Sequence, residues 1–264
     1  MNTLTAPLPS SGHGLDPRRM AGALGHEALG EWRNLVRMPA FSIPTLLFPV
    51  GFYAMFAIVL PFADTTQAAA TLLVNFTIFG VFAPGLFAFG VGLANDRDEG
   101  WLRLKQTAPL PIPVMMIARM LVAMVFALAV VVALFAVAAT AGGVRLERSA
   151  WLILAITGVL AVIPASAIGM ALGAWMKARA AIAIVNIAYL GSAMLSGLWF
   201  PLHLMPDPVQ SIAPALPPFH LAELGRHATG LEAGSLAVSL SWLACVTIIA
   251  AALAMPGLRR QERK

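Results

Sequence analysis

Charged side chains are scarce in this chain of 264 residues: only 11% are Asp, Glu, Lys or Arg, while 59% are hydrophobic. A soluble domain typically carries about 25% charged residues, so the composition excludes an ordinary soluble protein and indicates a polytopic membrane protein. The net charge of +5 does not indicate nucleic-acid binding. The positive side chains gather at the ends of apolar runs, where membrane orientation and anionic lipids account for them.

Cysteine and nucleotide-binding motifs are also nearly absent. The single cysteine, Cys245, excludes a disulfide within this sequence. The sequence has no Cys-x-x-Cys pair or His/Cys cluster, so we do not expect a structural zinc site. No Gly-Lys pair occurs anywhere, so the sequence has no phosphate-binding P-loop. If ATP powers this protein, a different chain binds it.

Acidic residues are missing from the interior of every long apolar run, although the sequence contains 12 Asp and Glu. Proton-coupled transporters and many membrane enzymes place carboxylates inside the membrane. Their absence argues against a proton antiporter, an intramembrane metalloprotease and a metal-dependent transferase. Ser196 and His203 are two helical turns apart, but no oxyanion-hole or nucleophile-turn motif accompanies them. We therefore do not expect an enzyme.

The rest of the sequence is divided by its charges into six uncharged stretches: 38–63, 65–95, 120–144, 149–176, 180–206 and 233–258. Each exceeds the roughly 20 apolar residues that a helix needs to cross a bilayer. They predict an all-α polytopic membrane protein with six transmembrane helices. We expect the spans at about 41–62, 67–94, 116–142, 150–176, 180–204 and 236–256. A disordered tail at 1–20 and a basic tail at 259–264 would flank a transmembrane domain at 21–258.

The distribution of Lys and Arg predicts which side of the membrane each segment faces. With the N-terminus inside, the inside segments hold 14 of the 17 Lys and Arg side chains. This is the bias described by the positive-inside rule. We therefore expect both termini in the cytoplasm, together with the segment 95–113 between the second and third spans.

Two segments outside the spans are apolar enough to contact the membrane. Residues 21–37 mix charged and apolar side chains, which predicts an amphipathic helix at the cytoplasmic interface. The alternative is a simple positively charged anchor. Residues 209–235 are too apolar for a solvated loop and contain three prolines, so we expect short re-entrant or interfacial helices there. The interfacial-helix residues are Glu27, Glu31, Trp32, Arg33 and Arg37.

Polar and aromatic side chains recur at helical spacing in the second and fifth spans. Polar groups inside a lipid bilayer need a partner, which is either another helix or a translocation pathway. Both alternatives remain open for these faces. In the fourth span, by contrast, Ala165, Gly169 and Gly173 form a small-xxx-small series that predicts close helix packing. The polar and aromatic residues are Asn75, Phe76 and Phe79 in the second span and Asn186, Tyr189, Ser196 and Phe200 in the fifth.

The segment 95–113 concentrates charge between two apolar runs. Glu99 and Arg103 are four residues apart with the acid first, which favours an ion pair along a short helix. Three prolines at 109, 111 and 113 then end that helix. From the residues alone, the segment is either a solvated loop or a docking element for a soluble partner.

Three stretches of this sequence resemble the permease subunits of ABC-2 type (type V) exporters, in the group of drug-resistance and nodulation efflux permeases. Residues 31–39 (EWRNLVRMP) precede the first span, and residues 98–110 (DEGWLRLKQTAPL) follow the second. Residues 196–201 (SGLWFP), with Met205 and Pro206, are similar to the family's Ser-Gly-x-x-Phe-Pro…Pro pattern. Two departures occur: Trp101 stands where Thr is common, and Ala108 separates Thr107 from Pro109.

The resemblance implies a bacterial inner-membrane exporter of hydrophobic or amphipathic molecules such as drugs, natural products or lipids. Two permease chains, most simply a homodimer, would bind two copies of a separate ATPase that holds ATP and Mg²⁺, with no cofactor in this chain. Spans two and five would line the route at the dimer seam. The alternatives are a polysaccharide or glycolipid exporter, a non-transporting scaffold and a membrane-embedded enzyme. The resemblance assigns ATPase coupling to Asp98, Glu99, Gly100, Trp101, Arg103, Leu104, Thr107 and Pro109.

Overall fold

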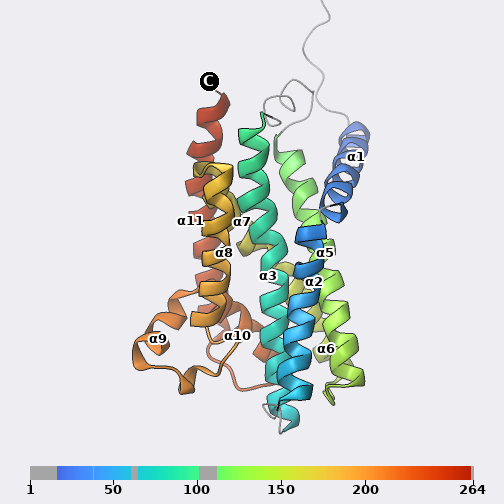
Figure 1. Ribbon diagram of the computed structural model, residues 1–264, viewed down its shortest axis with the longest axis vertical. Coiled ribbons are helices and arrows are strands. Elements are labelled where there is room, and N and C mark those ends of the chain that lie inside the picture. Colours follow the sequence, from blue (N-terminus) through green and yellow to red (C-terminus); the bar gives the residue numbers. More distant parts are fainter. Residues whose placement is uncertain (1–16, 38, 61–64, 101–111, 263–264) are drawn as a thin grey trace, which may run out of the picture.

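The computed structural model describes residues 17–37, 39–60, 65–100 and 112–262, and every regular element in these ranges is helical (Figure 1). The α-helices are α1 (Pro17–Val36), α2 (Pro39–Ala54), α3 (Thr66–Asp98), α5 (Ile112–Thr140), α6 (Arg148–Leu160), α7 (Val162–Trp175), α8 (Ala178–Leu195), α9 (Asp207–Ile212), α10 (Pro217–Thr229) and α11 (Leu236–Glu262). Three short elements complete the set: the π-helix η1 (Met55–Val59) and the 3₁₀ turns η2 (Leu202–Leu204) and η3 (Ala213–Ala215).

The long helices run roughly along one axis, so the molecule has two ends (Figure 1). The end called here the α1 end carries α1, the C-terminus of α3, the turn between α7 and α8 and the C-terminus of α11. The opposite end, called the α10 end, carries the N-terminus of α3 together with α9 and α10.

Within the described residues, five helical segments are long and apolar enough to cross a membrane: 66–98, 114–140, 148–175, 178–195 and 236–258. The expected first span corresponds to a shorter apolar helix, Ile43–Val59, formed by α2 and η1. Pro44 and Pro49 lie inside α2, and each removes a backbone N–H from the helical hydrogen-bond pattern. The prediction of an all-α polytopic membrane protein is confirmed.

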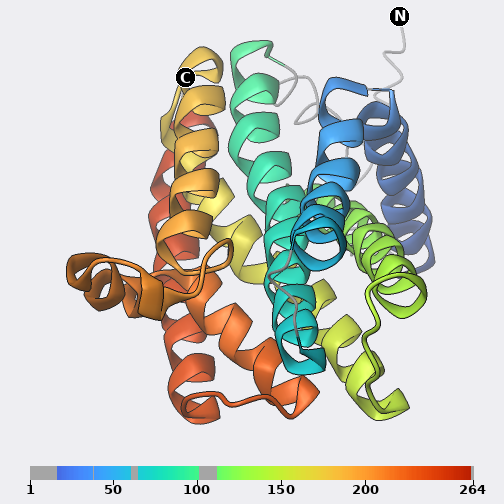
Figure 2. The ribbon, with the colours of Figure 1, turned by 60° about the horizontal axis from the view of Figure 1, so that its bottom comes forward.

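Helix α3 is the centre of the packing. It is apolar around its whole circumference, as is typical of a helix buried on every side. Phe76, Phe79 and Phe89 are each exposed by 1% or less. Helices α2 and α5 lie along one side of α3, and α7 and α8 lie along the other (Figure 2).

The contact between α3 and α7 depends on the absence of side chains. A Cβ atom added at Gly169 would lie 2.5 Å from the carbonyl oxygen of Leu86, and one added at Gly173 would lie 2.7 Å from the carbonyl oxygen of Gly90. Real Cβ atoms do not approach backbone oxygens this closely, so the two helix backbones are nearly in contact. The predicted packing role of these glycines is confirmed.

Two expected spans differ in detail from the sequence-based bounds. The fourth is interrupted at Ala161, between α6 and α7, because Pro164 has no N–H to donate to the carbonyl of Leu160. The fifth, expected to reach 204, ends with α8 at Leu195. Gly197 then turns the chain with a φ of 78°, a conformation that favours glycine. The short helices expected before the last span are present as α9 and α10.

Candidate functional sites at the two ends of α3

The C-terminus of α3 ends in three consecutive charged residues, Asp96, Arg97 and Asp98. Successive residues of an α-helix point about 100° apart, so three adjacent side chains reach three different directions. Each of them bonds to a different neighbour at the α1 end.

Asp96 belongs to a buried ion cluster centred on Arg119 of α5. The Arg119 Nη2 group donates a hydrogen bond to Glu31 Oε1 of α1 at 2.9 Å and a second one to Asp96 Oδ2. Its side chain is only 6% exposed, and that of Glu31 only 10%. One guanidinium therefore ties α1, α3 and α5 together away from water, where an ion pair is screened least.

Arg97 and Asp98 bind the turn between α7 and α8. Arg97 donates hydrogen bonds to the carbonyl oxygens of Gly173 at 3.2 Å, Ala174 at 2.8 Å and Met176. The last carbonyls of a helix have no intrahelical partner and attract a cation, so Arg97 caps the C-terminus of α7. Asp98 Oδ2 accepts a hydrogen bond from the backbone N–H of Ala178 at 2.8 Å, which caps the N-terminus of α8.

Asp96, Arg97 and Asp98, at the start of the expected docking segment, are thus bonded to α5, α7 and α8, and Arg119 links them further to α1. A force that displaces the end of α3 acts directly on the first three helices and through Arg119 on α1. This arrangement can transmit movement from a bound partner at the α1 end into the bundle.

Only part of the expected docking segment is described. Glu99 is exposed and follows the last residue of α3, and Gly100 has a φ of 76°. This positive φ favours glycine and turns the chain away from the helix axis. The other residues assigned to ATPase coupling lie outside the described part of the chain: Trp101, Arg103, Leu104, Thr107 and Pro109.

The residues expected on the interfacial helix separate into two groups. Glu31 is buried against Arg119, and the ring of Trp32 lies 5.1 Å from the ring of Phe126, near the middle of α5. Arg33 and Arg37 are exposed, and Glu27 is half-buried. The C-terminal part of α1 therefore packs along α5. That α1 lies at a membrane interface stays a prediction.

Most of the expected translocation residues lie inside the chain, in an aromatic cluster. The Phe79 and Tyr189 rings stack at 4.8 Å, and the Tyr189 hydroxyl donates to the carbonyl oxygen of Phe79 at 3.0 Å. Phe76 stacks on Phe56 at 5.7 Å, and Phe56 meets Phe200 edge-on at 6.0 Å. These contacts join α3, α8 and η1.

Asn186 lies outside this aromatic cluster. It is half-buried, and its Nδ2 donates to the carbonyl oxygen of Ile182 one turn earlier in α8. Whether any of these side chains contacts a transported molecule stays a prediction.

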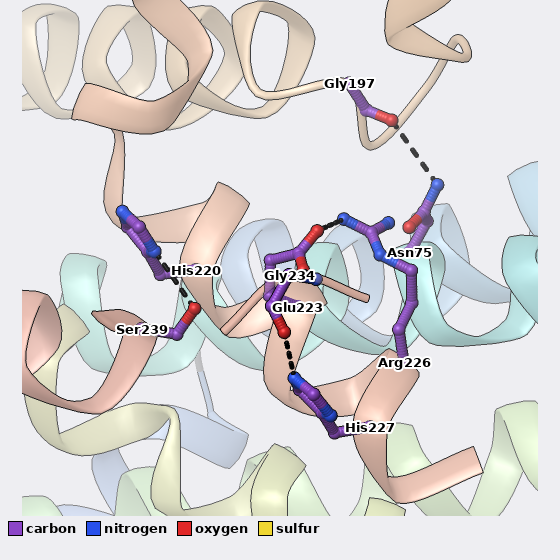
Figure 3. Close-up of polar contacts among 8 residues, drawn as sticks. All are labelled: Asn75, Gly197, His220, Glu223, Arg226, His227, Gly234 and Ser239. Atoms are coloured by element: carbon purple, nitrogen blue, oxygen red, sulfur yellow. Dashed lines mark hydrogen bonds and ion pairs between the residues drawn. The ribbon is translucent and has the colours of Figure 1, made fainter. Parts of the chain in front are cut away.

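Asn75, Ser196 and Phe200 instead line a cavity of about 480 Å³ at the α10 end. The cavity lies between α3, the turn after α8, and α10. Asn75 Nδ2 donates to the carbonyl oxygen of Gly197 at 3.3 Å, which ties α3 to that turn (Figure 3).

Polar contacts hold α10 against the last span and complete the cavity wall. Arg226 donates to Glu223 Oε1 at 2.6 Å, and the second carboxylate oxygen of Glu223 accepts the backbone N–H of Gly234 (Figure 3). His220 donates from Nε2 to the carbonyl oxygen of Pro214 at 2.8 Å. Its Nδ1 therefore accepts the hydroxyl of Ser239 at 3.1 Å.

Sequence reasoning missed both charge clusters. Arg119 falls within the expected third span, and a charge inside a span calls for an opposite charge nearby. That signal calls for an acidic partner, which the structure identifies as Glu31 and Asp96. The pair Glu223 and Arg226 is spaced three residues apart within an apolar segment, which is helical ion-pair spacing.

Comparison with known proteins places this architecture in a family. The model of the ABC-2 type transporter family matches residues 28–229, which include the end of α3 and most of the cavity wall. The Bacillus subtilis (strain 168) protein named "Putative transport permease YvfS" is 27% identical over 199 residues, covering 75% of this chain and 81% of the relative. The chain therefore belongs to the ABC-2 type transporter family, as a multi-pass membrane protein of the permease type.

Proposed function

We propose that the chain is the permease subunit of an ATP-driven exporter and that a separate ATPase docks on the segment that begins at Asp98. The observation that carries the proposal is that the α3 C-terminus is hydrogen-bonded to α5, α7 and α8, and is linked through Arg119 to α1. A docking segment can do mechanical work only if its movement reaches the spans, and Asp96, Arg97 and Asp98 supply that connection.

The assembly that fits this role contains two permease chains and two ATPase subunits, with ATP and Mg²⁺ held by the ATPases. Both termini and the α1 end face the cytoplasm of a bacterial cell, and the α10 end faces outward. ATP binding can shift the permease from an inward-facing to an outward-facing state only to the extent that the assembly binds ATP more tightly in the outward-facing state.

The proposed substrate is a hydrophobic or amphipathic molecule, such as a drug, a natural product or a lipid. Most of the side chains that α8 exposes are apolar, including Ile187 at 72% and Met194 at 51% exposed. If α8 lies at the seam between the two permease chains, these side chains favour an apolar route over one lined with polar groups that bind sugars. A polysaccharide or glycolipid substrate remains the second candidate within the family.

Substitutions that reverse a charge and remove an apolar side chain in the docking segment test whether the ATPase binds there. The double variant Glu99→Arg plus Leu104→Asp is expected to lose its candidate ABC ATPase in a pull-down of the detergent-solubilised full chain. Losing central contacts of an interface weakens binding by roughly 30-fold or more. Basal ATPase activity of the eluted complex is measured in parallel.

Glu147→Arg is the matched control, because Glu147 is an exposed acid at the α10 end. It should retain the ATPase, and all variants should elute as single species with wild-type unfolding midpoints. Undiminished capture by the double variant would place the docking site elsewhere. If the wild-type chain itself binds no ATPase, the scaffold and enzyme alternatives return.

Arg97→Ala tests coupling separately from docking. It leaves the carbonyl groups at the end of α7 without their cap, while the docking segment keeps its own side chains. We expect the ATPase to co-purify normally, but the ATPase activity of the reconstituted complex to fall by roughly two- to thirtyfold, which corresponds to the 0.5–2 kcal/mol usual for changes in coupling. Arg179→Ala, an exposed cation on α8 at the same end, should leave the activity unchanged. Equal activities of the two variants would contradict the coupling role of Arg97.

A further inference from the structure

The cavity at the α10 end has the size and walls of a small-molecule site. Its volume of about 480 Å³ falls within the roughly 300–1,000 Å³ that is usual for ligand pockets. Four aromatic rings line it: Phe56, Trp199, Phe200 and Phe219. The faces of such rings attract apolar bodies and cations alike.

One of the acidic side chains that line the cavity has no ion-pair partner among the described residues. Arg226 is neutralised by Glu223 at 2.6 Å, and both oxygens of Glu223 are occupied, the second by the N–H of Gly234. Glu232 also lines the cavity, is exposed, and forms no ion pair with another residue that the structure describes. The lining therefore favours a positively charged ligand over an anion.

A buried hydrogen-bond acceptor adds a second, independent feature. Asn75 is only 6% exposed, and its Nδ2 group is used by Gly197, while its Oδ1 has no partner among the described residues. Gln67, Thr71 and Asn75 follow one another at four-residue intervals on α3, and all three line the cavity. Buried acceptors are nearly always paired, so the orphan oxygen calls for an N–H or O–H donor.

A buried donor also lacks a partner in the same wall. The indole Nε1–H of Trp199 has no acceptor among the described residues, although Trp199 lines the cavity. A ligand that presents both an N–H group and a carbonyl or ether oxygen would satisfy Asn75 and Trp199 together.

We propose that this cavity binds an aromatic amphiphile bearing a protonated amine. Its ammonium group pairs with Glu232, and its aromatic body lies against Phe56, Trp199, Phe200 and Phe219. Asn75 and Trp199 provide the remaining polar contacts. The site is formed within one chain, so binding requires neither the ATPase nor a transport cycle, and the proposal goes beyond the proposed export function.

Three benzophenone probes of similar size test this proposal by photolabelling of the purified full chain at pH 8. They are 4-benzoylbenzylamine, 4-benzoylbenzyl alcohol and 4-benzoylbenzoic acid, which place a positive, a neutral and a negative head on the same aromatic body. Labelled peptides are identified by mass spectrometry. We expect the amine to label the segments 67–75, 196–203 and 219–232 most strongly and the acid least.

Glu232→Gln decides whether the acid recognises the amine. Labelling by the amine should fall about fivefold toward that of the alcohol, as expected for one partly exposed charge pair, while labelling by the alcohol stays constant. The ratio of amine labelling to alcohol labelling is compared between variants. Because both probes partition into detergent in the same way for each variant, this partition does not affect the comparison. Glu147→Gln, an exposed acid at the same end that does not line the cavity, should leave this ratio unchanged.

Two results would overturn the proposal. Equal labelling of these segments by all three probes would show that the cavity accepts apolar molecules whatever their charge, as it would accept lipid or detergent chains. An unchanged amine-to-alcohol ratio in Glu232→Gln would remove Glu232 as the recognition group. Both readouts are independent of ATPase capture, so failure of the export proposal does not affect them.

Discussion

Arg119→Met is expected to lower the free energy of unfolding by about 3–5 kcal/mol, the usual effect of removing one partner from a buried ion pair. The substitution leaves the carboxylates of Glu31 and Asp96 facing each other without the guanidinium that separates them. The side chain of Glu31 is only 10% exposed and that of Asp96 26%, so water compensates for the lost charge only in part. The apparent unfolding midpoint of the detergent-solubilised chain, followed by tryptophan fluorescence, measures the loss.

Companion variants identify the cause of that loss. Arg119→Lys keeps the charge but loses the planar guanidinium, whose Nη1 also donates to the carbonyl oxygen of Ala88 at 3.4 Å, so its midpoint should lie between those of wild type and Arg119→Met. Adding Glu31→Gln and Asp96→Asn to Arg119→Met removes the stranded charges and should recover part of the stability. A wild-type midpoint for Arg119→Met alone would contradict the structural role of the cluster.

The Arg119 cluster also bears on coupling, because it sets where α1 can lie. Glu31 is the buried contact through which α1 is held to α5, and Asp96 is the adjacent contact of α3. Loosening Arg119 therefore frees α1 and the α3 C-terminus together. Through Arg119, the positions of α1 and of the α3 C-terminus depend on each other although the two segments are far apart in sequence.

Much of the fold could be predicted from sequence, because lipid imposes a simple rule. A chain segment inside a bilayer must satisfy its backbone hydrogen bonds within a helix, so uncharged stretches of sufficient length are helices. Three details were less predictable: the short first span, the break at Ala161 and the end of α8 at Leu195. They depend on local proline and glycine geometry inside otherwise uniform apolar runs.

The candidate sites were predictable only in part. The acidic and basic residues around Asp98 stood out because they interrupt an apolar sequence, and the polar positions Asn75 and Ser196 stood out for the same reason. Many of their partners did not, because they are backbone groups: Arg97 and Asn75 donate to the carbonyl groups of Ala174 and Gly197, and Asp98 accepts the N–H of Ala178. A carbonyl group carries no sequence signal, and its position depends on how α7 and α8 pack in three dimensions.

Gly173→Val is expected to have the second large effect, because it forces apart α3 and α7, whose backbones are nearly in contact at this glycine. A Cβ at this position would overlap the carbonyl groups of Phe89 and Gly90, and a helix backbone cannot move aside as a flexible side chain can. Overpacking of this kind costs about 1–3 kcal/mol. The same displacement carries the end of α7 away from Arg97, which now bonds Ala174 at 2.8 Å.

Gly173→Val should therefore lower the unfolding midpoint and, in the reconstituted complex, reduce ATPase activity as Arg97→Ala does. Gly191→Ala on α8 is the matched control, since nothing lies within 4 Å of the added Cβ, and alanine has a higher helix propensity than glycine. Its midpoint should equal or exceed that of wild type. If Gly173→Val and Gly191→Ala behaved alike, α3 and α7 would have room to separate, and the Arg97 cap could not transmit movement between them.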